Sequence, residues 1–498
     1  MFTFQKIFQP TKYFLVFGLL LTFTSFTKGQ DLQNIKETVG EIVKNSRTPG
    51  ASVLIAKDGE IILDEGYGMA NLNFDVPTTN KTKYYFVGPS LITPAVAVLQ
   101  LIEQKKIALD DRVYDIIPGL HEDYKKVKIK HLLNFTSGVP DYHYLGDKFY
   151  IIGYPYPLDD IMGLFSHLPL MFEPGDRYDW SVSNSILLCK VVEVIAKQSF
   201  EDYFQKYFIE KLGLSETVYL DPIHLPVKNM ATGHEVSDKG PVIFSSGNLY
   251  KYGPSSQYAT TTGDVFRLWM GIVEGKLVPP GTYNLMKDKK EIEKNNSYPF
   301  GYGTRYYDIN GHQYIGMRAT LEGYSSSLFH SAEGRHTIIV LANSWLTAGS
   351  ISSEISRFMI DPYNYDVSQN QVNSATDLPL SDKLIRDYTG TYLMKMDPEA
   401  NVPLTYINHY KQTCRIFLKE NHLWMQSTFH TYPKKLLLQE DGSFVAEVNG
   451  IIKVSFEKTK NSTSLTTIAG PYVLKGAKTG GPSGKVFYET IAENILED

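Results

Sequence analysis

Hydrophobic periodicity divides the first hundred residues into a helix, a β-hairpin and a second helix. Two apolar stretches, residues 51–57 and 60–65, flank the turn signal Asp58-Gly59 and predict a hairpin. Residues 91–104 are apolar on most sides and predict a buried helix. The first helix is indicated by apolar positions at helical spacing: Leu32, Ile35, Val39 and Ile42.

Helices and loops fill the middle of the chain, and strands return after it. The pattern over residues 112–275 is mostly that of loops and helices. Later segments of strand character bracket the turn signals Asn310-Gly311 and Glu333-Gly334, and a helix is predicted over residues 350–358. These elements belong to a first domain, residues 30–365. Its predicted late strands are residues 303–308, 313–316, 324–331 and 336–342.

A second domain follows a polar segment. Residues 366–378 are polar without periodicity and predict a linker. Residues 379–478 carry short alternating segments separated by turn signals, which predicts a small all-β domain, either a barrel or a sandwich. Residues 479–498 are expected to form a tail. The clearest strand segments are residues 404–407, 415–419, 423–426, 444–448 and 453–457.

The N-terminus has the pattern of a signal peptide, residues 1–29. Lys6 and Lys12 precede an apolar run over residues 13–26, and Gly29 offers a cleavage point. The run is shorter than the ~20 residues that span a membrane. We therefore expect an exported protein, periplasmic or secreted, with no membrane span after cleavage; an uncleaved anchor is the alternative.

Charge and cysteine content exclude several classes of function. The formal charge is −5 and becomes −8 without Lys6, Lys12 and Lys28, so no basic surface for nucleic acid is expected. The 12 histidines show no metal-ligand spacing, and we predict neither a metal site nor a cofactor. Cys189 lies in an apolar run and is predicted to be a buried free thiol; a bridge between Cys189 and Cys414 is the alternative.

One continuous stretch carries a recognisable motif pattern. Residues 66–71 lead into Phe86-Val87-Gly88-Pro89-Ser90-Leu91, and residues 130–140 and 174–182 add further matching segments. This pattern resembles the serine β-lactamase and penicillin-binding-protein superfamily, in its class C and esterase-like branch, over about residues 45–345. The resemblance implies an α+β fold with an antiparallel sheet flanked by helices, a helical subdomain, and an active cleft between them. It also fits the all-β domain that exported relatives often append.

The first catalytic motif of that superfamily, S-x-x-K, is missing its functional groups here. The matching register places Gly88 at the serine and Leu91 at the lysine. Glycine has no nucleophilic atom and leucine cannot accept a proton, whereas acyl transfer needs both a nucleophile and a base. A shifted register makes Ser90 the fallback nucleophile, but it puts Thr93 at the lysine position.

The second and third motifs are degenerate as well. Trp180 stands at the proton-relay tyrosine and Val182 at the asparagine, and an indole N–H is only a donor. Met317 stands at the histidine or lysine of the third motif and Ala319 at its glycine. Backbone N–H donors near Gly88 and Ala319 could still polarise a carbonyl group.

These losses predict a catalytically inactive pseudoenzyme that binds a ligand or partner in the former cleft. Disabling a catalytic triad costs roughly 10⁶ in kcat, and four missing groups leave little to compensate. The alternative is a serine hydrolase, of esterase, peptidase or β-lactamase type, with relocated groups. A third hypothesis gives the β-domain an assembly role.

The predicted partner is a peptide, a glycan, another cell-wall-derived ligand or a protein. The aromatic residues after Asp141 border the cleft in relatives, so their side chains are candidates to line a groove, with packing as the alternative. The ligand-binding candidates are Tyr142, Tyr144, Trp180 and Arg318.

Overall fold

The computed structural model describes most of the two predicted domains. It covers residues 32–144, 157–220, 226–237, 240–243, 253–287, 300–321, 323–345, 347–365, 378–396, 411–419, 421–427, 434–446, 452–459, 462–469 and 472–480. The predicted signal peptide, residues 366–377 of the linker and the predicted strand 404–407 lie outside these ranges. Within them, no helix combines the length and apolar character needed to cross a membrane.

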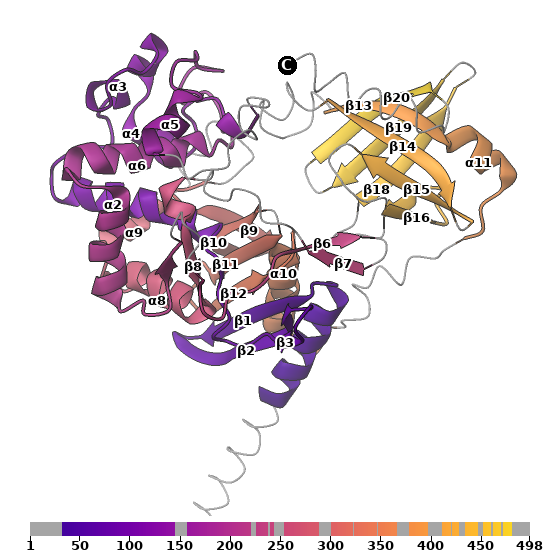
Figure 1. Cartoon of the computed structure of the whole chain (residues 1–498), viewed down its shortest axis with the longest axis horizontal. Coiled ribbons are helices and arrows are strands. Elements are labelled where there is room, and N and C mark those ends of the chain that lie inside the picture. Colours follow the sequence, from indigo (N-terminus) through magenta and orange to yellow (C-terminus); the bar gives the residue numbers. More distant parts are fainter. Residues whose placement is uncertain are drawn as a thin grey trace, which may run out of the picture.

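A seven-stranded antiparallel sheet forms the centre of the first domain (Figure 1). Its strand order is β3-β2-β1-β12-β11-β10-β9, which joins the N-terminal hairpin to the late strands as the superfamily resemblance implied. The predicted strands 324–331 and 336–342 are confirmed at both ends. The members are β1 (Gly50–Lys57), β2 (Glu60–Asn71), β3 (Val76–Pro77), β9 (Arg305–Ile309), β10 (His312–Leu321), β11 (Tyr324–Ser331) and β12 (His336–Ala342).

Both faces of this sheet are buried, because successive side chains along a strand point to opposite faces. Val53 and Ile55 of β1 pack with the helix at residues 32–45 and with α10 (Thr347–Ile360), whereas Leu54 and Ala56 join the larger core that includes α8 (Thr262–Val273). Two-sided burial explains why residues 51–56 are almost continuously apolar.

The helical region continues the larger core beyond the sheet. Its two longest helices, α2 (Ile92–Glu103) and α6 (Ser183–Ala196), pack against each other. The remaining described elements are short. They are β4 (Tyr84–Tyr85), η1 (Pro89–Leu91), α3 (Val113–Ile116), η2 (Glu122–Lys126), α4 (Ile129–Leu133), η3 (Tyr142–Tyr144), α5 (Leu158–Gly163), α7 (Phe200–Phe204), a π-helical turn (Gln205–Glu210), β5 (Val218–Tyr219), β6 (His234–Ser237), β7 (Gly240–Ile243), η7 (Pro254–Ser256), β8 (Tyr258–Thr260) and α9 (Pro280–Met286).

The second domain is a closed eight-stranded barrel, which settles the choice between barrel and sandwich. Its strands follow chain order, and β13 pairs with β20 to close it. A helix precedes it that the sequence pattern did not predict, α11 (Asp382–Tyr388). The strands are β13 (Gly390–Met396), β14 (Lys411–Lys419), β15 (His422–Ser427), β16 (Lys434–Leu438), β17 (Phe444–Ala446), β18 (Ile452–Lys458), β19 (Thr463–Ala469) and β20 (Tyr472–Gly480).

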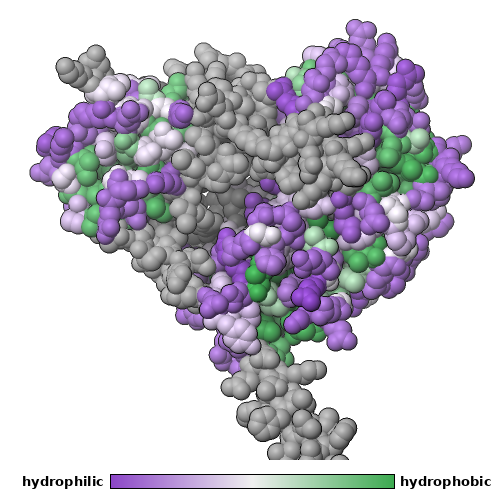
Figure 2. Space-filling view, turned by 180° about the vertical axis from the view of Figure 1, so that it is seen from behind, coloured by the Kyte–Doolittle hydropathy of each residue, from purple (hydrophilic) through white to green (hydrophobic). Residues whose placement is uncertain are grey.

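Both cysteines are buried free thiols, so the alternative of a bridge between Cys189 and Cys414 is wrong. Cys189 lies inside α6 of the first domain and Cys414 inside the barrel core. On the face shown in Figure 2, the described surface is mostly hydrophilic and is interrupted by separate apolar patches.

Candidate functional site

Gly88 lies where the backbone leaves no room for a side chain. It ends the loop between β4 and η1, with a φ of 72° that L-residues rarely adopt. A Cβ atom on Gly88 would lie 2.8 Å from the backbone nitrogen of Ala319 on β10. The Ser326 hydroxyl donates to the carbonyl of Val87 and holds this loop against β11. The structure therefore places Gly88 beside Ala319, and the backbone of β10 occupies the space that a nucleophilic side chain would need.

The side chains at the other degenerate positions are apolar and are wholly or partly buried. Leu91 is 7 % exposed and Met317 is 1 % exposed, and both belong to the larger core. Val182 is buried in the same core at the start of α6. The degenerate positions of all three motifs thus contribute to one hydrophobic cluster, with Trp180 and Ala319 at its partly exposed margin.

Ser90, the fallback nucleophile, is buried, and no base contacts its hydroxyl among the described residues. Its side chain is fully buried, and its hydroxyl lies 3.2 Å from the hydroxyl of Ser256 in η7. A serine hydroxyl is not a base at neutral pH. The shifted register, with Ser90 as nucleophile, therefore lacks a proton acceptor at the serine, as the original register does.

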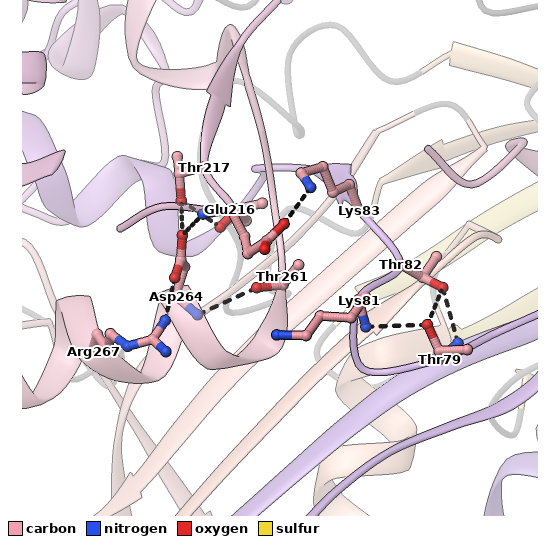
Figure 3. Close-up of polar contacts among 10 residues, drawn as sticks. Thr79, Lys81, Thr82, Lys83, Glu216, Thr217, Thr261, Asp264 and Arg267 are labelled. Atoms are coloured by element: carbon pink, nitrogen blue, oxygen red, sulfur yellow. Dashed lines mark hydrogen bonds and ion pairs between the residues drawn. The ribbon is translucent and has the colours of Figure 1, made fainter. Parts of the chain in front are cut away.

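Lys83, five residues before Gly88, is the nearby lysine that sequence reasoning did not weigh as a relocated base. Its ammonium group is buried and lies 2.5 Å from the Glu216 carboxylate (Figure 3). Glu216 is held in turn, because its backbone N–H donates to Asp264 at 2.8 Å. The Lys83 ammonium group lowers the pKa of Glu216. Through Glu216, this ion pair links the residue before β4 to Asp264 of α8.

Trp180 lies on a stack of aromatic rings. Its indole is parallel to the ring of Phe135, with centroids 4.9 Å apart and an interplanar angle of 5°. Phe300 contacts both rings, at 4.6 Å from Phe135 and 6.2 Å from Trp180. Trp180 is half-buried, whereas Phe135 and Phe300 are buried.

Two of the ligand-binding candidates make packing contacts within the described structure. Tyr142 is 1 % exposed and packs against Phe165, so it is a core residue in this structure. Arg318 is exposed, but its guanidinium lies 5.4 Å from the Tyr307 ring on the α10 side of the sheet. Neighbouring residues of a strand face opposite sides, so Arg318 points away from buried Met317. The side chain of Tyr144 lies outside the described part of the chain.

The comparison with protein families decides what this fold is. The Beta-lactamase family model matches residues 35–353, which is more than half of the chain. The chain belongs to the Beta-lactamase family. The matched range includes Gly88, Trp180 and Met317, so all three degenerate motifs lie inside it.

Relatives of this Beta-lactamase family protein are distant. Protein flp of Staphylococcus aureus strain MW2 is 25 % identical over 321 residues, 62 % of this chain and 63 % of that protein. The chain therefore spans less than two thirds of that relative. Penicillin-binding protein 4* of Bacillus subtilis is 22 % identical over 449 residues, covering 84 % of this chain and 97 % of that protein.

Solved structures share the fold of the family protein. The octameric penicillin-binding protein homologue from Pyrococcus abyssi has a TM-score of 0.59 at 18 % identity, covering 89 % of this chain and 100 % of that one. FmtA from Staphylococcus aureus has a TM-score of 0.54 at 18 % identity, covering 65 % of this chain and 88 % of that one. At these identities the likeness concerns the fold.

Asp141 is a buried carboxyl group next to the second motif of the family protein. It is 1 % exposed and accepts hydrogen bonds from the backbone N–H groups of His143, at 3.0 Å, and Val182, at 3.2 Å. Burial raises the pKa of Asp141 to about 7, and the nearby carboxylate of Asp179 adds to the rise. Asp141 follows the family-like segment 130–140 directly, but its burial cannot be read from sequence.

The raised pKa of Asp141 predicts a stability that falls with pH. The folded state keeps a proton that the unfolded state has released, so this contribution is complete below about pH 4 and is lost by about pH 7. Asp141→Asn should abolish this pH-dependent loss of unfolding free energy, which amounts to at most roughly 4 kcal/mol. Urea unfolding at pH 5 and pH 8 measures the difference.

The exposed α5 residue Asp160 gives a matched control, because Asp160→Asn should leave the pH dependence of the wild type unchanged. An Asp141→Asn protein whose unfolding free energy followed the same pH profile as the wild type would show that Asp141 is not protonated in the folded state.

Proposed function

We propose that this Beta-lactamase family protein is an exported, catalytically inactive pseudoenzyme that binds a ligand or protein partner beside its former catalytic centre. The observation that carries the proposal is the contact at Gly88, where backbone of β10 occupies the space a nucleophilic side chain needs. Buried Leu91 and Met317 support it, because neither offers a proton-handling group. The partner class is a peptide, a glycan, another cell-wall-derived ligand or a protein.

The rival function, hydrolysis by relocated groups, lacks support at each position tested. Ser90 faces a hydroxyl group rather than a base, and Lys83 is fixed in its ion pair with Glu216. General-base catalysis needs a proton acceptor within hydrogen-bond reach of the nucleophile. Neither residue supplies that arrangement to the other in this structure.

Export is proposed from the N-terminal sequence. Lys6 and Lys12 before a short apolar run, with Gly29 after it, are typical of a cleaved signal peptide. The absence of a spanning helix among the described residues is compatible with release after cleavage.

Purified protein should hydrolyse neither a chromogenic β-lactam nor a p-nitrophenyl ester above the uncatalysed rate. A fluorophosphonate probe should leave no serine adduct by mass spectrometry. Ser90→Ala should match the wild type in both assays, because Ser90 is buried. N-terminal sequencing of the same preparation from the exported fraction should start after Gly29.

The opposite pattern would overturn the proposal. Hydrolysis that disappears in Ser90→Ala, with an adduct on Ser90 in the wild type, would establish the relocated hydrolase. Hydrolysis that persists in Ser90→Ala would point to another nucleophile and would still end the pseudoenzyme interpretation.

A further inference from the structure

The aromatic stack under Trp180 is built from two loops that are fastened together. The backbone N–H of Asp179 donates to the Phe135 carbonyl at 2.9 Å, and that of Gly175 donates to the Thr136 carbonyl at 2.8 Å. A third bond joins the Met171 N–H to Gly138 at 2.8 Å. These bonds fix the segment that carries Trp180 against the segment that carries Phe135.

Phe135 holds an unfavourable backbone conformation within this arrangement. Its φ is 58°, a region that bulky residues rarely occupy and that costs on the order of 1–3 kcal/mol. The conformation places the Phe135 ring parallel to the indole of Trp180 and 4.6 Å from the Phe300 ring. Such strain persists where the surrounding structure holds it, and it is common at ligand-binding sites.

The stack leaves Trp180 partly exposed, and its indole N–H makes no hydrogen bond to the described residues. Trp180 is half-buried at the margin of the larger core, and its described ring contacts are with Phe135 and Phe300. Trp180 therefore combines partly exposed apolar ring surface, held in place by the stack, with an N–H donor at the ring edge.

We propose that Trp180 is a stacking platform for a sugar ring, so that the ligand of this protein is a saccharide. The inference rests on the proposed function and names its ligand class. A pyranose has an apolar C–H face that lies flat on an indole, and its hydroxyl groups lie at the ring edge, where they accept from the indole N–H.

Other flat or cationic ligands fit this site less well. A phenylalanine side chain would use the indole face but would leave the N–H without an acceptor, which costs binding free energy. Quaternary ammonium ions are held by cages of several aromatic faces, whereas here the Phe135 face is covered by Trp180. A nucleic acid would meet an acidic chain with a formal charge of −5.

Saccharide binding is measured on the full protein by saturation-transfer NMR and isothermal calorimetry, with chitotriose, cellotriose and maltotriose as probes. We expect at least one of them to bind the wild type with a Kd in the millimolar range or tighter. Trp180→Ala should weaken that binding by about tenfold or more. Trp180→Phe should bind the saccharide with an affinity between those of the wild type and Trp180→Ala, since it keeps a flat ring and loses the N–H.

Two further variants separate the platform from general damage. Phe135→Leu keeps Trp180 but removes the ring beneath it, and it should also weaken saccharide binding. Trp424→Phe changes a barrel tryptophan that is 7 % exposed and should leave binding unchanged. Circular dichroism melting of each variant confirms that the binding comparison is made on folded protein.

The proposal is overturned if no probe binds at millimolar concentration, if folded Trp180→Ala binds as the wild type does, or if a phenylalanine peptide binds at Trp180 in place of all three sugars. Hydrolysis of a β-lactam or ester by a protein that also binds sugar through Trp180 would end the pseudoenzyme proposal and leave the platform standing. If the protein is inactive and binds no sugar, the platform proposal fails and the pseudoenzyme proposal stands.

Discussion

Restoring the first motif by Gly88→Ser and Leu91→Lys should give a protein that is less stable than the wild type and that does not hydrolyse a β-lactam. A serine at position 88 meets the Ala319 nitrogen and keeps an unfavourable φ, which costs roughly 1–3 kcal/mol. A lysine at position 91 replaces a side chain that is 7 % exposed and buries an ammonium group, at a further cost of several kcal/mol. Urea unfolding and β-lactam hydrolysis measure both effects.

Single substitutions separate the causes in that double variant. Leu91→Met conserves volume and should cost less than about 1.5 kcal/mol. Gly59→Ser has a similar starting φ of 82° but no atom near the added Cβ, so it measures backbone strain without a steric contact. A double variant that formed a covalent acyl-enzyme with a β-lactam would contradict our account of Gly88.

Gly316→Ala should destabilise the first domain by about 3 kcal/mol or more. Gly316 has a φ of 155°, and a Cβ atom there would lie 1.9 Å from the Leu328 carbonyl oxygen and 3.0 Å from its Cδ2. The contact is with backbone of the paired strand β11, so relief requires β10 and β11 to separate locally. The midpoint and free energy of urea unfolding report the loss.

A helical glycine provides the comparison. Gly281 in α9 has no atom within 4 Å of an added Cβ, and alanine is the better helix former. Gly281→Ala should therefore leave stability unchanged or raise it by up to about 1 kcal/mol. Equal unfolding free energies for the Gly316→Ala and Gly281→Ala proteins would show that β10 can move away from Leu328 at no cost.

The sequence predicted the sheet where turn signals delimit its strands. Asp58-Gly59 and Glu333-Gly334 both lie at real hairpin turns, and β11 and β12 begin and end at the predicted residues. The predicted strand 313–316 was too short, because β10 continues to Leu321 through the polar residues Arg318 and Thr320. Barrel closure was undetermined because pairing β13 with β20 depends on contacts far apart in sequence.

The sequence identified the residues at the degenerate motif positions but not how they lie relative to one another. The motif register identified Gly88 and Ala319. Only the fold shows that the backbone of Ala319 fills the space of a side chain at Gly88. Arg318 lies over the Tyr307 ring, on the face of β10 opposite buried Met317, as expected for neighbouring residues of one strand. The burial of Asp141 and the backbone strain at Phe135 depend on tertiary packing and leave no local signal.

The closed barrel limits how the second domain can recognise anything. Its first strand pairs with its last, so the described barrel offers no unpaired strand edge for a peptide to extend. Strand addition is therefore not open to a peptide partner at the described barrel strands. The same closure protects the barrel from edge-to-edge association with its own copies, which is a common route to aggregation for open β-domains.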